Sequence, residues 1–427
     1  MDRIVVNGGR RLKGRVQISG SKNATLPIMA ATILAKGRVR LDNVPNIRDI
    51  KSMVAVLRTL GANVVNGGRG TVTISTRRIN KPEAHYELVK TMRASILVLG
   101  PLLATQGVAR VSLPGGCAIG TRPIDIHLKG LEALGADIRI EEGYVIAEAE
   151  RLKGGNYKMP FASVGATENI MMAASLADGT TILENCAKEP EITDLANFIN
   201  EIGGEVNGAG TERIEIVGKD KLYGASYSIM PDRIEAGTFL VAGALTRGDV
   251  TVGPMRAEWL QSFLDKLSEA GVNFEINDEN ETIRVFPPYE FKPVTVKTDV
   301  FPFFPTDLQA QLMTLSTITE GESTYHETIF ENRFMHVAEL CRLGADIKID
   351  GSIARVKGVK ELSGAEVMAS DLRASAALVL AGLIAKGRTV VRRVYHIDRG
   401  YELFEEKLAK LGANIIRDRD AANSPKK

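Results

Sequence analysis

The segment LPGGCAIGTRP places Cys117 in a glycine- and proline-rich stretch, five residues before Arg122. Loops of this composition are exposed and mobile, and a neighbouring guanidinium favours the thiolate form of a cysteine. Cys117 is therefore predicted to be a reactive thiol rather than a small buried residue. The other two cysteines carry no such signal. Cys341 is predicted to lie in the core on a helix, and Cys186 follows a strand without an activating neighbour.

Five arginines stand in loops or at helix starts, among residues of little charge: Arg93, Arg122, Arg333, Arg373 and Arg399. A guanidinium forms forked hydrogen bonds with phosphate and carboxylate groups. One such arginine is usually a solvated surface residue. Five in similar settings predict a ligand that carries several negative charges.

Other kinds of site find little support in the sequence. No CxxC or His/Cys spacing indicates a metal site, and no Walker or Rossmann loop follows a strand, so no nucleotide cofactor is implied. The five histidines are scattered and form no Ser-His-Asp order. A net charge of +2 argues against a nucleic-acid partner, which would require a basic stripe.

The composition is that of an ordinary soluble protein, with 427 residues of which 44% are hydrophobic and 25% charged. The start, MDRIVVNGG, lacks the apolar segment of a signal peptide, and SILVLGPLLA is far shorter than the roughly 20 residues of a membrane span. Three cysteines favour a reducing cytoplasm. Residues after about 418 are predicted to be a disordered tail.

One motif repeats six times and indicates which elements position these residues. A helical run ends in a hydrophobic residue, glycine and a small residue, with the glycines 74, 68, 68, 73 and 68 residues apart. They are Gly61, Gly135, Gly203, Gly271, Gly344 and Gly412. A second series runs in phase: Gly37, Gly107, Gly179, Gly248, Gly321 and Gly387. Each glycine is predicted to take the left-handed conformation that ends a helix.

Each repeat is predicted to form an apolar helix, a strand, an amphipathic helix and a β-hairpin. In the first repeat, residues 23–36 form the buried helix, 38–44 the strand and 47–60 the amphipathic helix. A hairpin follows, with its turn at Asn66-Gly67-Gly68. The other turns are expected at Glu142-Gly143, Asn207-Gly208, Asn277-Asp278 and Asp350-Gly351.

The two ends of the chain supply the halves of one hairpin. RIVVNG at the start and IIRDRD near the end are lone strands, so the chain is expected to close on itself. Aligning RIVVNGGRRLKG with RIEIVGKDKLYG assigns residues 1–21 to the last three repeats. Two domains follow: 22–229, which carries the Cys117 loop, and 1–21 with 230–427. Two strands are expected to cross between them, near Gly20 and Met230.

The starts of the buried helices are predicted to gather at one end of each domain. A helix N-terminus offers free N–H groups and partial positive charge, which suit phosphate. Capping explains part of the pattern, since Thr306 and Gln309 are predicted to form a capping box. It does not explain the cations at these starts, which the helix dipole disfavours: Lys22, Arg93 and Arg373.

SGSKNA, LPGGCAIGTRPIDIHLKGLEALGA, SVGAT, FPTDLQ, ENRFMH, DLRAS and HIDRGYE resemble motifs of the enolpyruvyl transferase (carboxyvinyltransferase) family, in the branch that uses UDP-N-acetylglucosamine. The resemblance covers essentially the whole chain. It implies an α/β fold of two inside-out α/β barrel domains built from six repeats, with helices buried and sheets outward. It also implies phosphoenolpyruvate and UDP-N-acetylglucosamine as substrates, no metal or organic cofactor, and the first committed step of peptidoglycan synthesis. The charge and composition predict no nucleic-acid or membrane partner.

The resemblance also assigns residues. Lys22, Arg122 and Arg399, with Asn23, are implied to bind the phosphate end of phosphoenolpyruvate, and Arg333 and Arg373 its carboxylate. Cys117 resembles the general acid and Asp307 the base, with Lys22 and Arg399 assisting catalysis. The implied contacts of the nucleotide sugar are Asn23, Arg93, Arg122, Pro123, Ile124, Asp125, Ile126, Ser163, Val164, Gly165, Asp307 and Ile329. Some members have lysine where this chain has Phe161.

The chemistry of an enol ether agrees with these residue types. Adding an alcohol requires a proton at the neighbouring carbon, a base for the hydroxyl and cations for the departing phosphate. A cleft between the domains is expected to close on the anionic substrates. Three alternatives remain. The shikimate branch lacks the Cys117 loop, a thiol peroxidase does not need five loop arginines, and a non-catalytic scaffold leaves the helix starts unexplained.

Overall fold

The computed structural model describes residues 2–77, 79–90, 92–113, 115, 119–120 and 123–419. The chain forms two compact units. We call them the central unit (20–117 and 122–230) and the terminal unit (1–19, 118–121 and 231–427). Cys117, Arg122 and the predicted disordered tail from residue 420 onward lie outside the described residues.

Three four-stranded sheets form the outer layer of the central unit, each with one parallel pair followed by two antiparallel pairs. The first contains β16 (Ser226–Ser228), β4 (Arg38–Asp42), β6 (Thr71–Ser75) and β5 (Asn63–Gly68). The second contains β7 (Glu83–Ala84), β8 (Val108–Ser112), β10 (Tyr144–Glu148) and β9 (Asp137–Glu141). The third contains β11 (Asn156–Lys158), β12 (Thr180–Glu184), β14 (Arg213–Val217) and β13 (Val206–Asn207). A small parallel pair joins β15 (Leu222–Tyr223) to β3 (Ala35–Lys36).

The terminal unit repeats this arrangement. Its first sheet contains β18 (Phe274–Asn277), β19 (Thr282–Val285), β17 (Asp249–Gly253) and β2 (Lys13–Gln17). The second contains β20 (Thr295–Lys297), β21 (Glu322–His326), β23 (Ile353–Lys357) and β22 (Asp346–Asp350). The third contains β24 (Glu366–Met368), β25 (Arg388–Arg392), β1 (Arg3–Asn7) and β26 (Asn414–Asp418). The sixfold repeat and the α/β class are confirmed. The sheets remain separate, because each one ends in a strand that pairs on one side only, so the described strands close no barrel.

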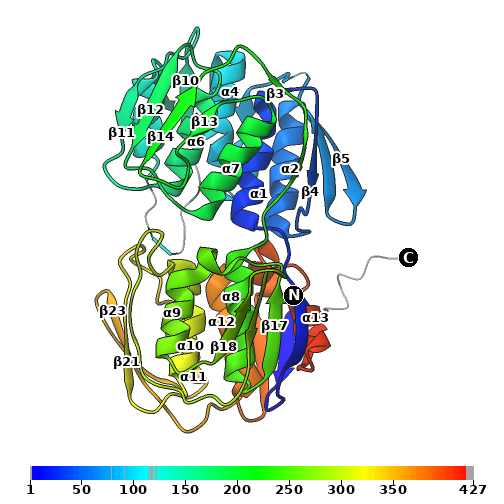
Figure 1. Ribbon diagram of the computed structural model, residues 1–427, viewed down its shortest axis with the longest axis vertical. Helices are drawn as coiled ribbons and strands as arrows, with labels where there is room; N and C mark the ends of the chain where they lie inside the picture. The colour runs from blue at the N-terminus through cyan, green and yellow to red at the C-terminus, as the bar shows by residue number, and fades with distance from the viewer. Residues whose placement is uncertain are drawn as a thin grey trace. The chain divides into compact units, whose positions relative to one another are not determined.

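The first helix of each repeat is buried on nearly all sides, because its residues are small or apolar around the whole circumference. These helices are α1 (Lys22–Ala31), α4 (Leu99–Gln106), α6 (Val164–Ala174), α8 (Arg233–Leu245), α10 (Gln309–Ser316) and α12 (Leu372–Ile384). In the terminal unit α8, α10 and α12 pack against one another, with β21 and β23 on one side and β17 on the other (Figure 1). In the central unit α1 and α6 lie between β12 and β4 (Figure 1). Buried helices with outward sheets are confirmed.

The second helices are amphipathic and cover the units between sheets. They are α2 (Arg48–Leu60), α5 (Asp125–Ala133), α7 (Pro190–Glu201), α9 (Gln261–Glu269), α11 (Val337–Arg342) and α13 (Phe404–Lys410). On α2 the buried apolar residues recur every three or four positions: Ile50, Met53, Val56, Leu57 and Leu60. A short α3 (Tyr86–Val89) and 3₁₀ helices at Thr32–Leu34, Arg93–Val98, Ala257–Leu260, Thr306–Leu308 and Val394–Arg399 complete the helical elements. No described helix is long and apolar enough to cross a membrane.

The repeating glycines take the left-handed conformation as predicted, with φ between 71° and 130°, except Gly248. There the preceding Arg247 is left-handed instead, with φ of 51°. Gly248 is required for a different reason. A Cβ on it would lie 2.1 Å from the carbonyl oxygen of Leu12, which enters from the N-terminal segment.

The structure places the hairpin turns close to their predicted positions, except for the first one. The first turn falls at Arg69-Gly70 rather than at Asn66-Gly67-Gly68. Asn66 Oδ1 accepts the N–H of Gly68 at 2.9 Å, and the register shifts between these residues. This bulge moves the reversal two residues along the chain. Glu142 and Gly143 form the expected two-residue turn, both with positive φ.

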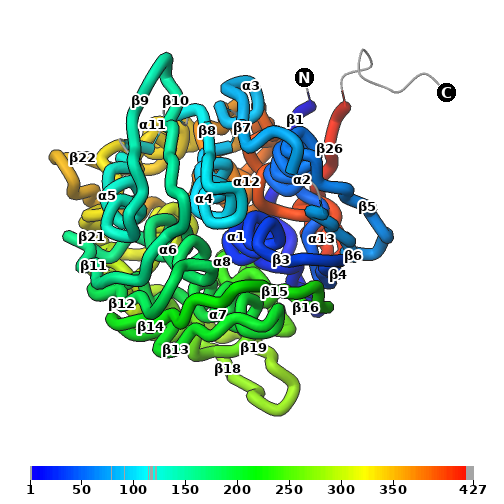
Figure 2. Tube along the Cα trace, turned by 90° about the horizontal axis from the view of Figure 1, so that it is seen from above, coloured from blue at the N-terminus to red at the C-terminus, as the bar shows by residue number. Residues whose placement is uncertain are grey.

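The strand pairing shows how the two ends of the chain are used. β1 pairs antiparallel with β26, which confirms the predicted hairpin of the two termini and is visible in Figure 2. β2 joins the terminal unit beside β17, although it precedes α1 in the sequence. β16 precedes α8 but joins the central unit beside β4. The two predicted crossing strands are therefore present, and each is paired in the unit opposite to the helix that follows it.

Candidate active site

Asp307 lies between two buried arginines in the terminal unit. Its Oδ1 accepts a hydrogen bond from Arg333 Nη2 at 2.8 Å, and its Oδ2 accepts one from Arg373 Nε at 3.2 Å. Arg333 is 4% exposed and Arg373 is 3% exposed. Buried cations are stable only when they are paired and hydrogen-bonded. The structure thus brings together three predicted site residues from three different segments.

Arg373 has more donors than this pairing uses. Its Nη1 and Nη2 are buried and have no hydrogen-bond partner of good geometry among the described residues, although the Tyr401 hydroxyl interacts with the guanidinium. The ring of Tyr401 packs over the guanidinium, 5.2 Å from Cζ. Buried guanidinium groups normally satisfy these nitrogens with an oxyanion in a forked pair. The two open donors therefore indicate an anion-binding position.

Asp371 and Tyr401 fix the orientation of Arg373. Asp371 caps α12, since its Oδ1 accepts the N–H groups of Arg373 at 3.0 Å and Ala374 at 3.1 Å. The Tyr401 hydroxyl lies 2.9 Å from Thr238 Oγ1 on α8. Burial raises the pKa of Tyr401, so it remains a phenol. Arg399 ends the 3₁₀ helix two residues before Tyr401, which ties its segment to the same region.

His336 supports the backbone next to Arg333. Its Nδ1 lies 3.2 Å from the Arg333 carbonyl oxygen. A carbonyl oxygen can only accept, so Nδ1 carries the proton. Burial lowers the pKa of His336 to about 4, and the imidazole is therefore neutral at pH 7. The histidine adds no charge beside the two arginines.

The capping box predicted for Thr306 and Gln309 is wrong. The 3₁₀ helix that begins at Thr306 has no side-chain cap. Thr306 Oγ1 instead donates to Glu327 Oε2 at 2.9 Å, and the Gln309 amide lies 3.7 Å from Met313 Sδ. The Thr306 hydroxyl is engaged by a residue that local sequence spacing cannot reveal.

In the central unit, α1 begins with a cation as predicted. Ser21 caps the helix, its Oγ accepting the N–H of Ala24 at 3.3 Å. Lys22 is the first helical residue and Asn23 the second. Lys22 Nζ lies 3.7 Å from Asp49 Oδ2, and Asp49 is only 3% exposed. This carboxylate offsets the unfavourable interaction of Lys22 with the helix dipole.

Asn169 joins three segments that carry predicted contacts of the nucleotide sugar. Its Oδ1 accepts the N–H of Gly100 at 2.7 Å, and its Nδ2 donates to the Ile96 carbonyl at 3.1 Å, in the 3₁₀ helix that starts at Arg93. The same Nδ2 lies 3.1 Å from His127 Nδ1 on α5. These partners fix the amide orientation, so His127 Nδ1 is the acceptor and, in the neutral ring, Nε2 carries the proton.

The starts of α5 and α6 are in direct contact. Ser163 caps α6, its Oγ accepting the N–H of Ala166 at 3.4 Å. A Cβ on Gly165 would lie 3.2 Å from His127 Cε1, so the glycine permits close packing. Asp125 and Ile126 therefore lie near Ser163, Val164 and Gly165, which the sequence separates by almost forty positions. Pro123 and Phe161 are exposed beside these starts.

Two residues of the predicted reactive loop are described. Ile119 and Gly120 belong to the terminal unit, where the Ile119 carbonyl accepts the N–H of Asn332 at 3.0 Å. A Cβ on Gly120 would lie 2.0 Å from Glu331 Oε2. That oxygen is the end of a flexible, exposed side chain, so the φ of 147° is the reason that glycine is favoured here. The chain two and three residues beyond Cys117 lies next to the segment that leads into Arg333.

The two described cysteines differ from each other. Cys341 is exposed, so the prediction that it belongs to the core is wrong: it lies on the solvent side of the one-and-a-half-turn helix α11. Cys186 is buried, and burial raises the pKa of its thiol to about 12. Neither is placed near a predicted site residue by any described contact.

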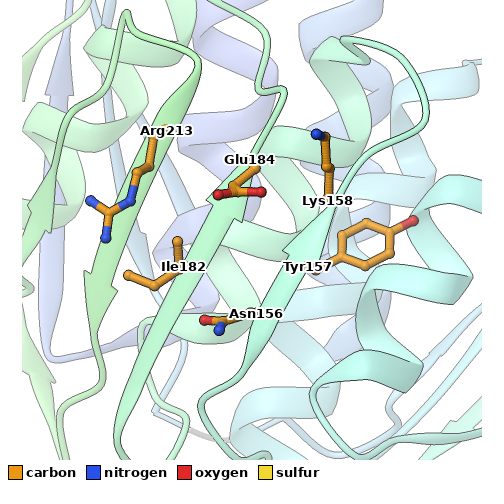
Figure 3. A pocket seen from close by; sticks show the side chains of 6 residues that line it. All are labelled: Asn156, Tyr157, Lys158, Ile182, Glu184 and Arg213. Carbon is orange, nitrogen blue, oxygen red and sulfur yellow. The ribbon is translucent and has the colours of Figure 1, made fainter.

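A pocket of ≈ 380 Å³ lies elsewhere, on the outer face of the β11-β12-β14 sheet (Figure 3). Lys158, Glu184 and Arg213 stand on three adjacent strands at paired positions, and Asn156, Tyr157 and Ile182 complete the lining. None of these is a predicted site residue. Alternating charges across a sheet are typical of a solvated face.

Sequence reasoning missed the residues that hold the predicted ones in place: Asn169, His127, Tyr401, His336 and Glu327. His127, His336 and Tyr401 fall within the motifs that carried the resemblance. Asn169 and Glu327 had no local signal, because their partners lie far away in the sequence. Within the described residues, no group of three or more His, Cys, Asp or Glu side chains is placed to hold a metal ion.

Comparisons with known proteins define the class. A family model described as EPSP synthase (3-phosphoshikimate 1-carboxyvinyltransferase) matches residues 6–408. The enolpyruvyl transferase NikO from Streptomyces tendae superposes with a TM-score of 0.88 at 27% identity, covering 97% of this chain and 98% of that one. EPSP synthase from Acinetobacter baumannii shares the fold, with a TM-score of 0.74 at 19% identity, covering 98% of this chain and all of that one. The chain belongs to the enolpyruvyl transferase family and has the fold of that family.

Curated relatives narrow the family. UDP-N-acetylglucosamine 1-carboxyvinyltransferase of Geobacter metallireducens is 56% identical over 98% of this chain and 99% of its own. The enzyme of the same name from Trichlorobacter lovleyi is also 56% identical, again over 98% and 99% of the two chains. The chain belongs to the family of UDP-N-acetylglucosamine 1-carboxyvinyltransferases.

Proposed function

We propose that the protein transfers the enolpyruvyl group of phosphoenolpyruvate to the 3′-hydroxyl of UDP-N-acetylglucosamine and releases phosphate. This is the reaction that the resemblance assigns to the first committed step of peptidoglycan synthesis. The observation that carries the proposal is the pair of buried arginines around Asp307. The open Nη1 and Nη2 of Arg373 are the donors that a substrate carboxylate requires.

The carboxylate of phosphoenolpyruvate binds Arg333 and Arg373 in this proposal. In the structure Asp307 satisfies one donor of each guanidinium. A substrate carboxylate on the remaining donors places a second anion beside the arginines and weakens their pairing with Asp307. Asp307 is then released to accept a proton from the sugar hydroxyl, which an ion-paired carboxylate does poorly. Binding of one substrate thus prepares the base for the other.

The phosphate group is assigned to Lys22, Arg122 and Arg399, with Asn23 beside Lys22. Lys22 suits this role because it is the first residue of α1, where the helix dipole adds partial positive charge, and because Asp49 holds its ammonium group at 3.7 Å. A departing phosphate gains negative charge as the C–O bond breaks. Fixed cations stabilise that charge without having to reorganise.

The nucleotide sugar is assigned to helix starts of the central unit and to two positions of the terminal unit. The central positions are Asn23, Arg93, Arg122, Pro123, Ile124, Asp125, Ile126, Ser163, Val164 and Gly165, and the terminal positions are Asp307 and Ile329. The contacts of Asn169 and Gly165 that join the helix starts support a common binding surface there. Phe161 cannot bind the diphosphate as a lysine does, so backbone N–H groups at the start of α6 take that role.

The reaction proceeds by addition and elimination. Cys117 donates a proton to the methylene carbon of phosphoenolpyruvate, while the 3′-oxygen bonds to the adjacent carbon and gives its proton to Asp307. The product of this step is a tetrahedral ketal that still carries the phosphate. The Cys117 thiolate then takes a proton back from the new methyl group, the C–O bond to phosphate breaks, and the double bond re-forms in the enolpyruvyl ether. The proton held by Asp307 leaves with the phosphate. No electron acceptor is needed, because the oxidation states of the product match those of the substrates.

Phosphate release with purified protein tests this function. We expect release from phosphoenolpyruvate when UDP-N-acetylglucosamine is present, and none with either substrate alone. Shikimate 3-phosphate serves as the rival acceptor. Turnover with shikimate 3-phosphate that equals or exceeds turnover with the nucleotide sugar would overturn the assignment.

A further inference from the structure

Glu327 is a buried carboxylate with no cationic partner among the described residues. It follows β21 directly and is 3% exposed. Four donors satisfy it. Oε1 accepts the N–H groups of Ile329 at 2.9 Å and Phe330 at 3.2 Å and the hydroxyl of Thr298 at 2.9 Å, and Oε2 accepts the hydroxyl of Thr306 at 2.9 Å. Burying a charge without a counter-ion is unfavourable unless hydrogen bonds replace its hydration.

The two oxygens hold two different parts of the candidate site. Oε1 fixes the turn that contains Ile329 and leads to Arg333. Oε2 fixes Thr306, whose neighbour is Asp307. The segments are 21 residues apart in the sequence, and the Arg333–Asp307 hydrogen bond of 2.8 Å joins them again a few residues further on. Glu327 therefore sets the spacing between the acid and one of its two arginines.

A second contact strengthens the same arrangement. Thr298 Oγ1, which donates to Glu327, also accepts the N–H of Thr328 at 3.0 Å, and the Thr328 hydroxyl bonds to the Thr298 carbonyl. The turn 327–330 is thus fixed to the end of the neighbouring β20 strand. On the side toward Asp307, Oε2 holds Thr306, next to a backbone hydrogen bond of 3.0 Å from the Asp299 N–H to the Phe304 carbonyl. Loss of the Oε2 contact should loosen Asp307 while the turn keeps its shape.

We propose that Glu327 is a positioning residue for Asp307 and Arg333, acting through Thr306 and the turn 328–330. The inference rests on the proposed function, since it assumes that these two residues act on the substrates. Glu327 touches neither substrate in this scheme. Glu327 places the base Asp307 within hydrogen-bond reach of the proton that it accepts, so its loss should lower kcat. The affinity for the nucleotide sugar should change far less, because other residues make most of its contacts.

Two substitutions separate positioning from folding. Glu327→Gln keeps an oxygen for the three Oε1 contacts, and its amide can donate to Thr306, whose hydroxyl then turns to accept. Thr306→Val removes only the Oε2 contact and preserves the size of the side chain. Glu327→Ala removes all four contacts. Glu322, at the exposed start of the same strand, provides the matched control Glu322→Ala.

We expect Thr306→Val and Glu327→Ala to lower kcat about tenfold to a hundredfold with KM for UDP-N-acetylglucosamine changed less than about threefold, the range for lost hydrogen bonds to a charged group. Glu327→Gln should retain kcat within about threefold, because it restores the contacts. The double substitution Thr306→Val with Glu327→Gln should lose no more than Thr306→Val alone. Circular dichroism and thermal unfolding confirm which variants fold.

Two results overturn the proposal. One is that Thr306→Val behaves like Glu322→Ala in a folded protein. The other is that Glu327→Gln falls as far as Glu327→Ala while both remain folded. If Glu327→Ala does not fold, Thr306→Val and Glu327→Gln decide the matter. Failure of the wild-type protein to release phosphate would instead refute the proposed function. The positioning role of Glu327 would then be tested by thermal unfolding with phosphoenolpyruvate alone, where Thr306→Val should weaken the stabilisation that this ligand gives.

Discussion

Arg373 Nε donates to Asp307 Oδ2 at 3.2 Å, so the predicted base occupies one of the two arginines predicted to bind the substrate carboxylate. Arg333 is held by the other oxygen of the same carboxylate. The side chain of Asp307 thus acts as an internal substitute for an anionic ligand. A substrate carboxylate on the remaining donors of these arginines shares their charge with Asp307, which couples substrate binding to the state of the base.

Replacing Asp307 by asparagine tests this competition. We expect Asp307→Asn to lose almost all turnover, because an amide cannot accept the hydroxyl proton, yet to bind phosphoenolpyruvate about tenfold more tightly in the presence of the nucleotide sugar. Calorimetry on the inactive ternary complex measures the affinity. Asp350→Asn, at the exposed end of β22, is the control. Unchanged or weaker binding in Asp307→Asn would contradict the competition.

Lysine in place of Arg373 should weaken the binding of phosphoenolpyruvate selectively. An ammonium retains the charge but cannot form a forked pair, and it loses the packing of a planar guanidinium against Tyr401. We expect Arg373→Lys to raise KM for phosphoenolpyruvate by about tenfold or more. Arg355→Lys, at an exposed position of β23, should have no effect. Steady-state kinetics with each substrate varied in turn distinguish the two outcomes.

The repeat structure was predictable because it depends on local rules. Glycines that end helices, helices apolar on all sides and lone strands at the two ends are each encoded within a few residues. One exception involves a contact made at a distance. Gly248 is needed because Leu12, in the N-terminal segment, lies against it. The first hairpin turn differs from the prediction for a local reason, since Asn66 accepts a hydrogen bond from Gly68.

The candidate site was predictable at the level of residue types rather than of contacts. The motifs named Asp307, Arg333 and Arg373, but nothing in their spacing indicates that one carboxylate pairs with both guanidiniums. Thr306 was mistaken for a helix cap because Glu327, its true partner, follows 21 residues later. Cys341 was placed in the core by its helical neighbours, although its position on the short helix α11 faces solvent.

Alkylation should distinguish the three cysteines. Iodoacetamide at mildly alkaline pH is expected to modify Cys117 and the exposed Cys341, but not Cys186, whose pKa burial raises to about 12. Only modification of Cys117 should abolish turnover, and Cys341→Ser should be inactivated at the wild-type rate. Fosfomycin, an epoxide that carries a phosphonate, should alkylate Cys117 alone, and Cys117→Asp should resist it while retaining turnover. An inactivating adduct mapped by mass spectrometry to Cys186 or Cys341 would refute the assignment.

Asn169 should govern affinity for the nucleotide sugar. Asn169→Ala removes the hydrogen bonds that join Ile96, Gly100 and His127, so we expect KM for UDP-N-acetylglucosamine to rise about tenfold or more while KM for phosphoenolpyruvate changes little. Asn200→Ala is the matched control, since Asn200 makes two comparable hydrogen bonds to Val206 in another part of the same unit. Equal effects of the two substitutions on KM would show that Asn169 only stabilises the fold.

Asp194 should make the stability of the central unit depend on pH. Tyr227 Oη donates to its Oδ1 at 2.7 Å and the Met230 N–H to its Oδ2 at 3.3 Å, yet burial raises its pKa from 3.8 to about 6. Between these values the folded state keeps a proton that the unfolded state has lost. The protonated Asp194 therefore contributes its full share to the free energy of unfolding below pH 3.8, and this share is lost as pH rises through about 6. The total loss is about 3 kcal/mol, and about half of it falls above about pH 5.

Asp194→Asn cannot ionise, so the stability of the wild type relative to this variant should fall between about pH 5 and about pH 8. Urea unfolding at a series of pH values measures the difference, with the exposed Asp220→Asn as control. Parallel profiles for wild type and Asp194→Asn would show that the buried carboxylate ionises freely in the folded protein.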